Sequence, residues 1–355
     1  APQNLVLAAP GFARDPILTL ADRFALGLAA AEAAEAAPAA AAEATTAAID
    51  PDALPVRKEM RCEVLVAGVG TSGVLSALAA GREGADVLGV EPLAFPGGIP
   101  AGGGIHTYCA GVPGGLQEEL NERVDALTPN YLVAGGVGGF HPEARKVATD
   151  QLLRESGVRL LTGATICAVH AEAGRVQWAL AAAPGGLVRL RATGWIDGTG
   201  DGDFCALAGA GFDHGRAGDD LPHAYSQSGG RVENKEGAAS VCVINFDAGW
   251  VDPCDPEDFT RARIKGILDY LEDRYEDDWR YTYVAPAIGL RQWRQIRTDV
   301  MITLADLIEG RRFHDVVGYA CTFSDNHAVD MEFESDEFVF WIWGCRAWRD
   351  RLLVD

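Results

Sequence analysis

Cysteine is sparse in this sequence and is never clustered. No C-x-x-C pair occurs, which argues against zinc and iron–sulfur sites built on clustered cysteines, and we predict no metal site. Several cysteines stand in apolar, strand-like runs, as buried thiols do, so we expect a reducing compartment and a cytoplasmic location. The eight cysteines stand at positions 62, 109, 167, 205, 242, 254, 321 and 345.

Basic residues are also scarce relative to acidic ones. The chain has 30 Lys and Arg residues against 51 Asp and Glu residues, a net charge of −21. Such a chain has no evident basic surface with which to neutralise phosphates, so we do not expect a nucleic-acid partner. The acidity is interpreted as an aid to solubility.

Long apolar runs are absent as well. No run reaches the roughly 20 residues that cross a bilayer, so we expect no membrane span. The chain starts at Ala1 without a basic stretch ahead of an apolar core, so no secretory signal is predicted, although a removed leader is left open. Its 355 residues are enough for two domains or one large one.

The most informative stretch runs from residue 61 to residue 91. It reads RCEVLVAGVGTSGVLSALAAGREGADVLGVE. The apolar run Cys62–Ala67 is typical of a buried parallel strand, and apolar residues at helical spacing come after the glycines. Between strand and helix stands a G-x-G-x-x-G pattern formed by Gly68, Gly70 and Gly73.

Each part of this pattern has a physical role in dinucleotide binding. Gly68 permits a tight turn, Gly70 lets a pyrophosphate approach the backbone, and Gly73 lets helix and strand pack closely. The helix N-terminus offers free N–H groups to the phosphates. Glu91 ends the next apolar run, where a carboxylate can accept hydrogen bonds from ribose hydroxyls. A glycine-rich turn in another kind of α/β domain is the alternative, but the context favours a dinucleotide.

A second glycine block, GGIPAGGG, occupies residues 97–104 and follows soon after Glu91. So many glycines allow close approach to a flat ligand and leave N–H groups free to donate. The alternative is a disordered loop. Because the block follows a cofactor fingerprint directly, we favour contact with the cofactor.

A third block, GWIDGTGDGDFCALAGA, covers residues 194–210. Trp195–Asp197 ends a strand, a glycine turn follows, and a helix-like segment comes next. Asp201 and Asp203 stand near the helix start, where they would either cap free N–H groups or bind cofactor hydroxyls. Ligands of a doubly wound sheet lie at the carboxyl ends of strands from both halves, so separation in sequence is no obstacle.

The remaining periodicity predicts further elements. Strands 164–170, 175–181 and 187–191 form a meander that we expect to insert between parallel strands of the sheet. Arg291, Arg294 and Arg297 would share one side of a helix, as a surface or an anion clamp. Helices are also predicted at 141–156 and 259–271, and strands at 85–90, 158–161 and 238–246.

The predicted fold class is α/β, with a doubly wound parallel sheet, a Rossmann-like dinucleotide-binding domain, an inserted β-meander and a second α+β substrate or cap region. The expected organisation is an N-terminal appendage with an Ala-rich linker at 1–60, a dinucleotide domain at 61–212 and a substrate or cap region at 213–355.

Four stretches together resemble the FAD-dependent oxidoreductase family, which carries a glutathione-reductase-type Rossmann fold and is related to fumarate reductase flavoproteins. The resemblance runs from about Cys62 to His327. Its blocks are VLVAGVGTSGVLSALAAGREGADVLGVE, EPLAFPGGIPAGGGIHTYC, GWIDGTGDGDFCALAGA and IGLRQWRQIRTDVMITLADLIEGRRFHDVV.

The resemblance implies non-covalent FAD, although His106 and Cys109 stand near the position used for covalent attachment by fumarate reductase relatives. It places the pyrophosphate at the fingerprint, the adenosine ribose at Glu91 and the adenine at the Ile166 backbone. The implied pyrophosphate residues are Gly68, Gly70, Thr71, Ser72 and Gly73; the implied ribityl and isoalloxazine residues are Gly97, Gly98, Gly102, Gly103, Gly104, Gly200 and Asp201.

The resemblance also implies a catalytic set. Arg291 would stand near the flavin, and the pair Asp325 and His327 falls where the family has Asp-x-His close to the substrate. His327 would act as general base because its ordinary pKa is near working pH, with Asp325 to orient it and Arg291 to stabilise negative charge. His106 and His223 are weaker candidates.

One departure from the family pattern is the lack of its closing C-terminal block. The chain would then be a fragment, a cleaved product or one subunit completed by another chain. We expect either an enzyme that passes a hydride from a small-molecule substrate, such as a sugar or hydroxy compound, to FAD and on to an unknown electron acceptor, or an FAD-binding structural or electron-transfer subunit. A homo-oligomer and a second chain completing the flavin site both stay open. An NAD-dependent dehydrogenase is disfavoured, because such domains lack the second and third glycine blocks.

Overall fold

The computed structural model of this protein divides the chain into two units, residues 1–54 and 55–355. All helices and strands named below lie in the second unit. His106, Cys109, Asp325 and His327 are outside the described residues. The structure describes residues 54–105, 114–128, 140–216, 219–235, 238–273, 281–291, 293–302, 306 and 310–314.

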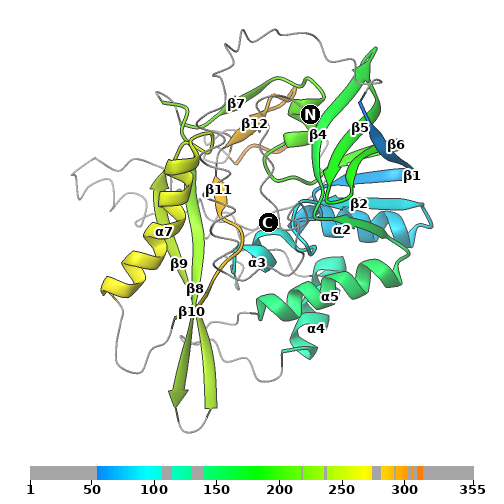
Figure 1. The fold of residues 1–355 in the computed structure, drawn as a ribbon. Helices are drawn as coiled ribbons and strands as arrows, with labels where there is room; N and C mark the ends of the chain where they lie inside the picture. Colours follow the sequence, from blue (N-terminus) through cyan, green and yellow to red (C-terminus); the bar gives the residue numbers. More distant parts are fainter. Residues whose placement is uncertain are drawn as a thin grey trace, which may run out of the picture. The chain divides into compact units, whose positions relative to one another are not determined.

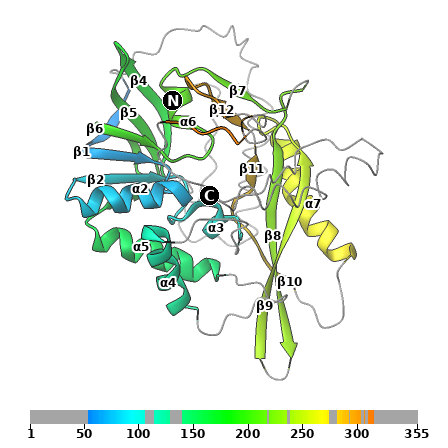
Figure 2. The ribbon, with the colours of Figure 1, turned by 180° about the vertical axis from the view of Figure 1, so that it is seen from behind.

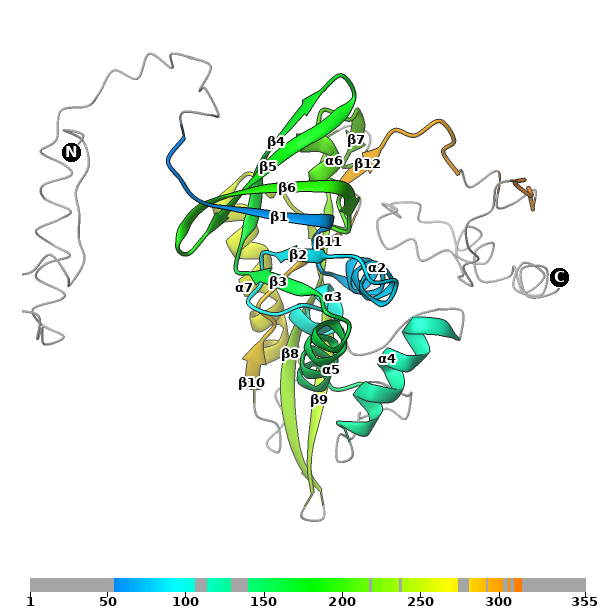
Figure 3. The same cartoon turned by 90° about the vertical axis from the view of Figure 1, so that its right-hand side faces the viewer.

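A six-stranded sheet forms the centre of the second unit, in the order β3-β2-β1-β6-β5-β4 (Figure 1, Figure 3). Strands β3, β2, β1 and β6 run parallel to one another, and β5 and β4 continue the sheet beyond β6 in antiparallel pairing. The strands are β1 (Val56–Ala67), β2 (Val87–Glu91), β3 (Arg159–Thr162), β4 (Thr165–Glu172), β5 (Arg175–Ala183) and β6 (Gly186–Asp197).

The predicted meander is present and is inserted between parallel strands of the sheet in chain order. It comes between β3 and β6 in sequence, yet in space β5 and β4 extend the sheet beyond β6 at its edge. The strand predicted at 187–191 and the strand predicted to end at Trp195–Asp197 are one strand, β6, because the long β1 pairs with it along its whole length. A single strand therefore closes the meander and also enters the parallel core.

Helices α2, α4 and α5 cover one face of the sheet, and the antiparallel strands with Phe204 of α6 pack on the other. The predicted α/β class is confirmed. Because neighbouring residues of a strand point to opposite faces, Val66 packs with residues of α2, α4 and α5, while Leu65 packs with β5 and with Phe204 of α6. The helices are α2 (Thr71–Arg82), α3 (Gly98–Gly102), α4 (Gly115–Ala126), α5 (Pro142–Glu155) and α6 (Asp203–Leu207).

A second group of strands follows the sheet in sequence. β8 pairs with β9, β10 and β11, and β7 pairs with β12 (Figure 2). The strand predicted at 238–246 and the helix predicted at 259–271 are confirmed as β9 and α7. These elements are β7 (Phe212–His214), β8 (His223–Lys235), β9 (Ala238–Trp250), α7 (Pro256–Asp273), β10 (Tyr281–Val284), β11 (Gly289–Arg291) and β12 (Arg294–Ile296).

The arginine-bearing helix predicted near residue 291 was wrong. Residues 289–291 and 294–296 are strands that pair with β8 and β7, so cross-strand partners decide their conformation rather than local spacing. Arg291 lies in β11 and Arg294 in β12, and Arg297 follows β12. They do not share one helical face.

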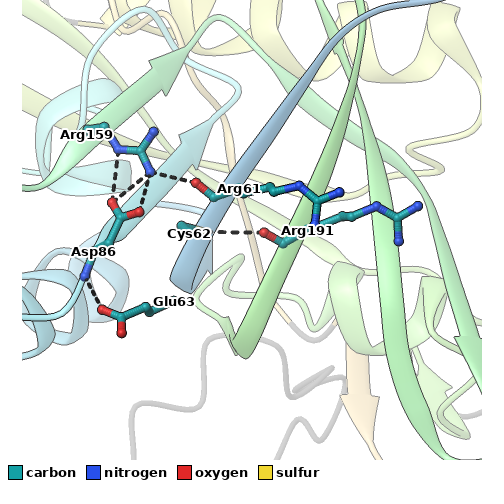
Figure 4. Close-up of polar contacts among 6 residues, drawn as sticks. All are labelled: Arg61, Cys62, Glu63, Asp86, Arg159 and Arg191. Atoms are coloured by element: carbon teal, nitrogen blue, oxygen red, sulfur yellow. Dashed lines mark hydrogen bonds and ion pairs between the residues drawn. The ribbon is translucent and has the colours of Figure 1, made fainter.

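A polar cluster joins the strands at the amino ends of β2 and β3 (Figure 4). The guanidinium of Arg159 donates to both carboxylate oxygens of Asp86 and, at 2.8 Å, to the carbonyl of Arg61. The N–H of Asp86 donates to the Glu63 carboxylate at 2.7 Å. These contacts fix the order of β3, β2 and β1 at the end of the sheet opposite to the glycine blocks.

None of the helices in the described ranges combines the length and the apolar character that a membrane crossing requires.

Candidate cofactor site

Three glycine blocks that are far apart in sequence meet at the carboxyl ends of β1, β2 and β6. The N–H of Gly68 donates to Val90 at 2.8 Å, the N–H of Gly198 donates to Ala67 at 2.7 Å, and the N–H of Gly97 donates to Val69 at 2.8 Å. Each bond joins the backbone of one block to that of another segment. The glycine turns therefore form one continuous surface of main chain at the end of the parallel sheet where ligands of such folds bind.

Packing explains two glycines of the fingerprint. Gly68 has a φ of +78°, and a Cβ there would stand 2.7 Å from the carbonyl oxygen of Gly198. A Cβ on Gly73 would collide with the carbonyl oxygen of Gly68. Both positions need glycine because a Cβ would overlap with backbone atoms of a neighbouring turn.

Gly70 differs from the other two glycines, and the difference tests whether a ligand fits. A Cβ on Gly70 would meet only ordinary contacts, 3.6 Å to the Gly198 oxygen and 3.8 Å to the Gly98 Cα, and the φ of Gly70 is negative. The fold itself therefore does not require glycine here. A side chain would instead occupy the space in front of the helix N-terminus, where the fingerprint predicts a pyrophosphate.

The N-terminus of α2 has the properties of an anion site. No side chain caps this helix at Gly70, and its first turn, Thr71 to Val74, contains no acid. Thr71 and Ser72 are exposed, and Gly73 is buried against the turn. Uncapped N–H groups and the helix dipole favour a phosphate at this position.

Glu91 lies at the end of β2 and is 4% exposed. One of its oxygens accepts a hydrogen bond from the N–H of Val69 at 2.9 Å, and the other accepts one from Leu93 at 3.0 Å. Burial raises the pKa of Glu91, and these two hydrogen bonds oppose the rise. The residue thus holds the fingerprint turn in place, a role that the sequence did not reveal.

Ile166 lies at the same end of the sheet, in β4. The N–H groups of Gly163 and Ala164 donate to the carbonyls of Leu93 and Glu91, at 2.9 and 3.1 Å. The start of β4 is thereby fastened beside Glu91. The predicted adenine contact stays a prediction, but the two residues named for the adenosine end come from neighbouring segments.

The second glycine block forms the short helix α3 rather than a disordered loop. Gly97 precedes it with a φ of +112°, and a Cβ on Gly98 would stand 2.8 Å from the Cα of Gly70. Gly102 is buried, and its carbonyl accepts a hydrogen bond from Ala287 at 3.0 Å. Gly103 and Gly104, which end the block, are buried too. The block therefore links the fingerprint to the segment that leads into β11.

Asp197 and Thr199 organise the third block, and the sequence prediction missed both. The carboxylate of Asp197 accepts hydrogen bonds from the N–H and hydroxyl of Thr199 and from the N–H of Cys205, at 2.6 to 3.0 Å. Burial alone would raise the pKa of Asp197, but these bonds outweigh it and lower the pKa. An Asp two residues before a Thr is the sequence signal of such a turn.

The capping role considered for Asp201 and Asp203 was wrong. Gly202 precedes α6 without a side-chain cap, and the N–H groups of the first turn are satisfied by Thr199 and Asp197. Asp203 instead forms an ion pair with Arg294 of β12. The turn is thus built without help from the Asp201 side chain.

Asp201 is half-buried next to Gly200, in the turn that follows β6. No hydrogen bond of its carboxylate is found among the described residues, although the neighbouring charges of Asp203, Arg294 and Asp197 act on it. Burial, with a further contribution from the Asp203 carboxylate, raises the pKa of Asp201 to about 6. A partly buried acceptor that the fold does not use fits the hydroxyl-binding role implied for it.

The predicted catalytic residues are only partly placed. The backbone of Arg291 lies in β11 directly opposite His223 of β8. His223 is 3% exposed and stands edge-on to the ring of Trp250 at 5.4 Å. The structure therefore brings Arg291 beside one of the weaker histidine candidates, while Asp325 and His327 fall outside the described residues.

Fold and site together define an α/β dinucleotide-binding protein. The sequence model of the family described as "FAD dependent oxidoreductase" matches residues 63–254, more than half of the chain. The chain belongs to this FAD-dependent oxidoreductase family, and its cofactor is FAD. None of the curated proteins matches the chain.

Solved structures show more distant similarity. A geranylgeranyl bacteriochlorophyll reductase-like protein from Thermoplasma acidophilum is 16% identical over 66% of this chain and 67% of its own, with a TM-score of 0.43. Anhydrotetracycline hydroxylase from Streptomyces rimosus is 16% identical over 67% of this chain, with a TM-score of 0.41, and the chain spans 54% of its length. p-Nitrophenol 4-monooxygenase from Pseudomonas putida is 15% identical over 67% of this chain and 69% of its own, with a TM-score of 0.40.

Proposed function

We propose that the protein binds FAD non-covalently and oxidises a small-molecule substrate, a sugar or another hydroxy compound, by transfer of a hydride to the flavin. The observation that carries this proposal is the convergence of three glycine blocks around an uncapped helix N-terminus, with space at Gly70 that the fold itself does not need. Family membership supplies the identity of the dinucleotide.

The chain's own residues would hold the cofactor from several sides. The first-turn N–H groups of α2 would donate to the pyrophosphate, and Glu91 would accept from the adenosine ribose. Asp201 would accept from a hydroxyl of the ribityl side, and the α3 backbone would lie against the flavin end. When bound, FAD supplies a two-electron acceptor at its isoalloxazine ring.

Three residues would serve the substrate. His327 would take the proton from the substrate hydroxyl, and Asp325 would orient the imidazole. Arg291 would stabilise negative charge beside the flavin, since a guanidinium keeps its charge at all working pH values. The resemblance to the Asp-x-His pattern of the family supports the assignment of Asp325 and His327. The hydrogen bond between Ala287 and Gly102, which links the segment before β11 to the second glycine block, supports that of Arg291.

The test measures the reduction of the flavin by candidate substrates in the absence of oxygen. A stopped-flow instrument records the loss of flavin absorbance. A panel of sugars and hydroxy acids would be mixed with the FAD-loaded protein. With a reactive substrate, His327→Ala should slow reduction about 100-fold or more and leave FAD bound, because general-base catalysis contributes about 10² to 10⁴. His170→Ala, which removes an exposed imidazole from β4, is the matched control.

The outcomes separate the alternatives. An unchanged rate in His327→Ala contradicts its role as the base. Reduction by a nicotinamide donor and by no hydroxy compound contradicts hydride transfer from such substrates. Reduction only by a co-purifying protein identifies an electron-transfer subunit instead.

A further inference from the structure

Strand β12 packs directly on the turn that carries Asp201. A Cβ on Gly202 would stand 2.5 Å from Cγ1 of Ile296, so this isoleucine side chain already fills the space over the turn. Arg294 stands two residues before Ile296, on the same face of β12, and forms an ion pair with Asp203, the first residue of α6. Two residues of β12 therefore contact the two residues that follow Asp201.

Arg294 is held in a defined position for this contact. Its guanidinium lies over the rings of Trp293 and Phe212, with 5.2 and 5.5 Å to the ring centroids. The Arg294 side chain is 22% exposed, whereas the side chain of its partner Asp203 is 51% exposed. A cation fixed by two aromatic rings and one carboxylate has little freedom to leave the turn.

We propose that Arg294 is a positioning residue for Asp201, and that β12 thereby keeps the third glycine block competent to bind FAD. Arg294 acts by neutralising Asp203, which would otherwise place an unbalanced negative charge beside the Asp201 carboxylate. This inference rests on the proposed contact between Asp201 and the cofactor. It gives the arginine-rich block after β11 a role in cofactor retention.

The charges that act on Asp201 come from three elements, and their signs give the direction in which the pKa of Asp201 should change when Arg294 is removed. Asp203 on α6 and Asp197 at the end of β6 favour the protonated form, and Arg294 on β12 favours the carboxylate. Removal of Arg294 leaves two negative neighbours without a cation. The pKa of Asp201 should then rise. As the pH falls, the Asp201 carboxylate should therefore become protonated, and stop accepting hydrogen bonds, at a higher pH than in the wild-type protein.

The experiment measures the FAD dissociation constant of the full chain, freed of FAD, between pH 5 and pH 8.5. Arg294→Met should weaken FAD binding about tenfold near pH 7, the size of one charge-assisted hydrogen bond. It should also raise the pH at which the FAD affinity is halfway between its low-pH and high-pH values, called the pH midpoint below. Arg294→Lys should restore most of the affinity. Arg297→Met is the matched control, because Arg297 forms a separate, exposed ion pair with Asp213.

A double variant isolates the mechanism. If Arg294 acts through Asp203, then Asp203→Asn combined with Arg294→Met should bind FAD nearly as the wild-type protein does. If Arg294→Met does not fold, the single variant Asp203→Asn still tests the proposal, since removal of a negative neighbour should move the midpoint downward. Carbon-13 NMR of the Asp201 carboxyl group reports the same shifts without FAD.

The outcomes test two statements separately: that Arg294 positions Asp201, and that Asp201 contacts FAD. Equal affinity and an equal midpoint in Arg294→Met and the wild-type protein would overturn the positioning role, and so would equal losses in Arg294→Met and Arg297→Met. A double variant as weak as Arg294→Met would also overturn it. Asp201→Ala tests the contact separately: if it binds FAD normally, the assignment of Asp201 to the cofactor fails, whatever Arg294 does.

Discussion

Two carboxylates in one short turn have opposite surroundings. Asp197 accepts three hydrogen bonds, and they lower its pKa in spite of burial. Asp201 has burial and a negative neighbour, and its pKa rises to about 6. The first residue is therefore committed to the fold, and the second is available to a ligand. Only the structure distinguishes them, because both stand in the same glycine-rich motif.

This difference predicts a pH dependence of stability in the FAD-free protein. The folded pKa of Asp201 lies above its ordinary value of 3.8, so the folded state binds this proton more tightly. The resulting stabilisation is fully present below pH 3.8 and is lost as the pH rises through about 6. Asp201→Asn removes this titration. The unfolding free energy of the variant relative to that of the wild-type protein, measured by urea denaturation, should therefore be higher at pH 8 than at pH 4.5.

Asp197→Asn is the control for this measurement. Because the folded pKa of Asp197 lies below 3.8, its contribution is present above that pH and is lost only as the pH falls through the lowered value. The variant should lose about 1 to 3 kcal/mol of unfolding free energy at both pH values. Equal pH profiles for Asp201→Asn and the wild-type protein would show that Asp201 titrates normally.

At the scale of elements, helix α2 is the element that we propose to bind the pyrophosphate. Its N-terminus is uncapped, and no acid in its first turn offsets the helix dipole. Most helices of globular proteins gain stability from such a cap, so its absence is a cost that a bound phosphate would offset.

An acid placed in the first turn of α2 should separate stability from binding. Ser72→Asp should stabilise the FAD-free protein by about 0.3 to 1 kcal/mol through the helix dipole. It should also weaken FAD binding by at least about tenfold, because two negative charges about 4 Å apart repel strongly near a protein surface. Thermal denaturation and FAD titration measure the two effects.

The matched control places the same charge on a different helix. Gln117→Glu adds an acid to the first turn of α4, whose described contacts are with α2 and α5 and not with the glycine blocks. It should leave FAD affinity unchanged. If Ser72→Asp binds FAD as tightly as the wild-type protein, the pyrophosphate does not lie at this helix end.

Elements with local signals could be predicted from the sequence, and elements decided by distant partners could not. The strand, glycine turn and helix of residues 62–82 follow from apolar spacing and glycine position. The arginine-bearing segment has helical spacing, yet Arg294 and Ile296 lie in a strand because β7 offers them a ladder. The long β6 was divided in the prediction for the same reason, since its pairing with β1 has no local signal.

At the scale of the whole molecule, the site is a product of topology. The three glycine blocks could be predicted to meet because parallel strands bring their carboxyl ends to one edge. Contacts between backbones, such as Gly98 against Gly70, could not be predicted, because they depend on how α3 folds back over α2. The hydrogen bond that the N–H of Val69 in the fingerprint turn donates to Glu91 is likewise visible only in three dimensions.

The absorbance spectrum of the purified chain, before and after acid precipitation, tests the central claim most directly. We predict flavin bands in the native protein that move to the supernatant, because in the proposed site backbone N–H groups and carboxylates hold FAD without a covalent bond. Gly73→Ala should lose these bands, since its Cβ would collide with Gly68, whereas Gly185→Ala, with open space and an ordinary φ, should keep them. A chain that stays colourless after incubation with FAD, or a Gly73→Ala variant that binds FAD like the wild-type protein, would contradict the account.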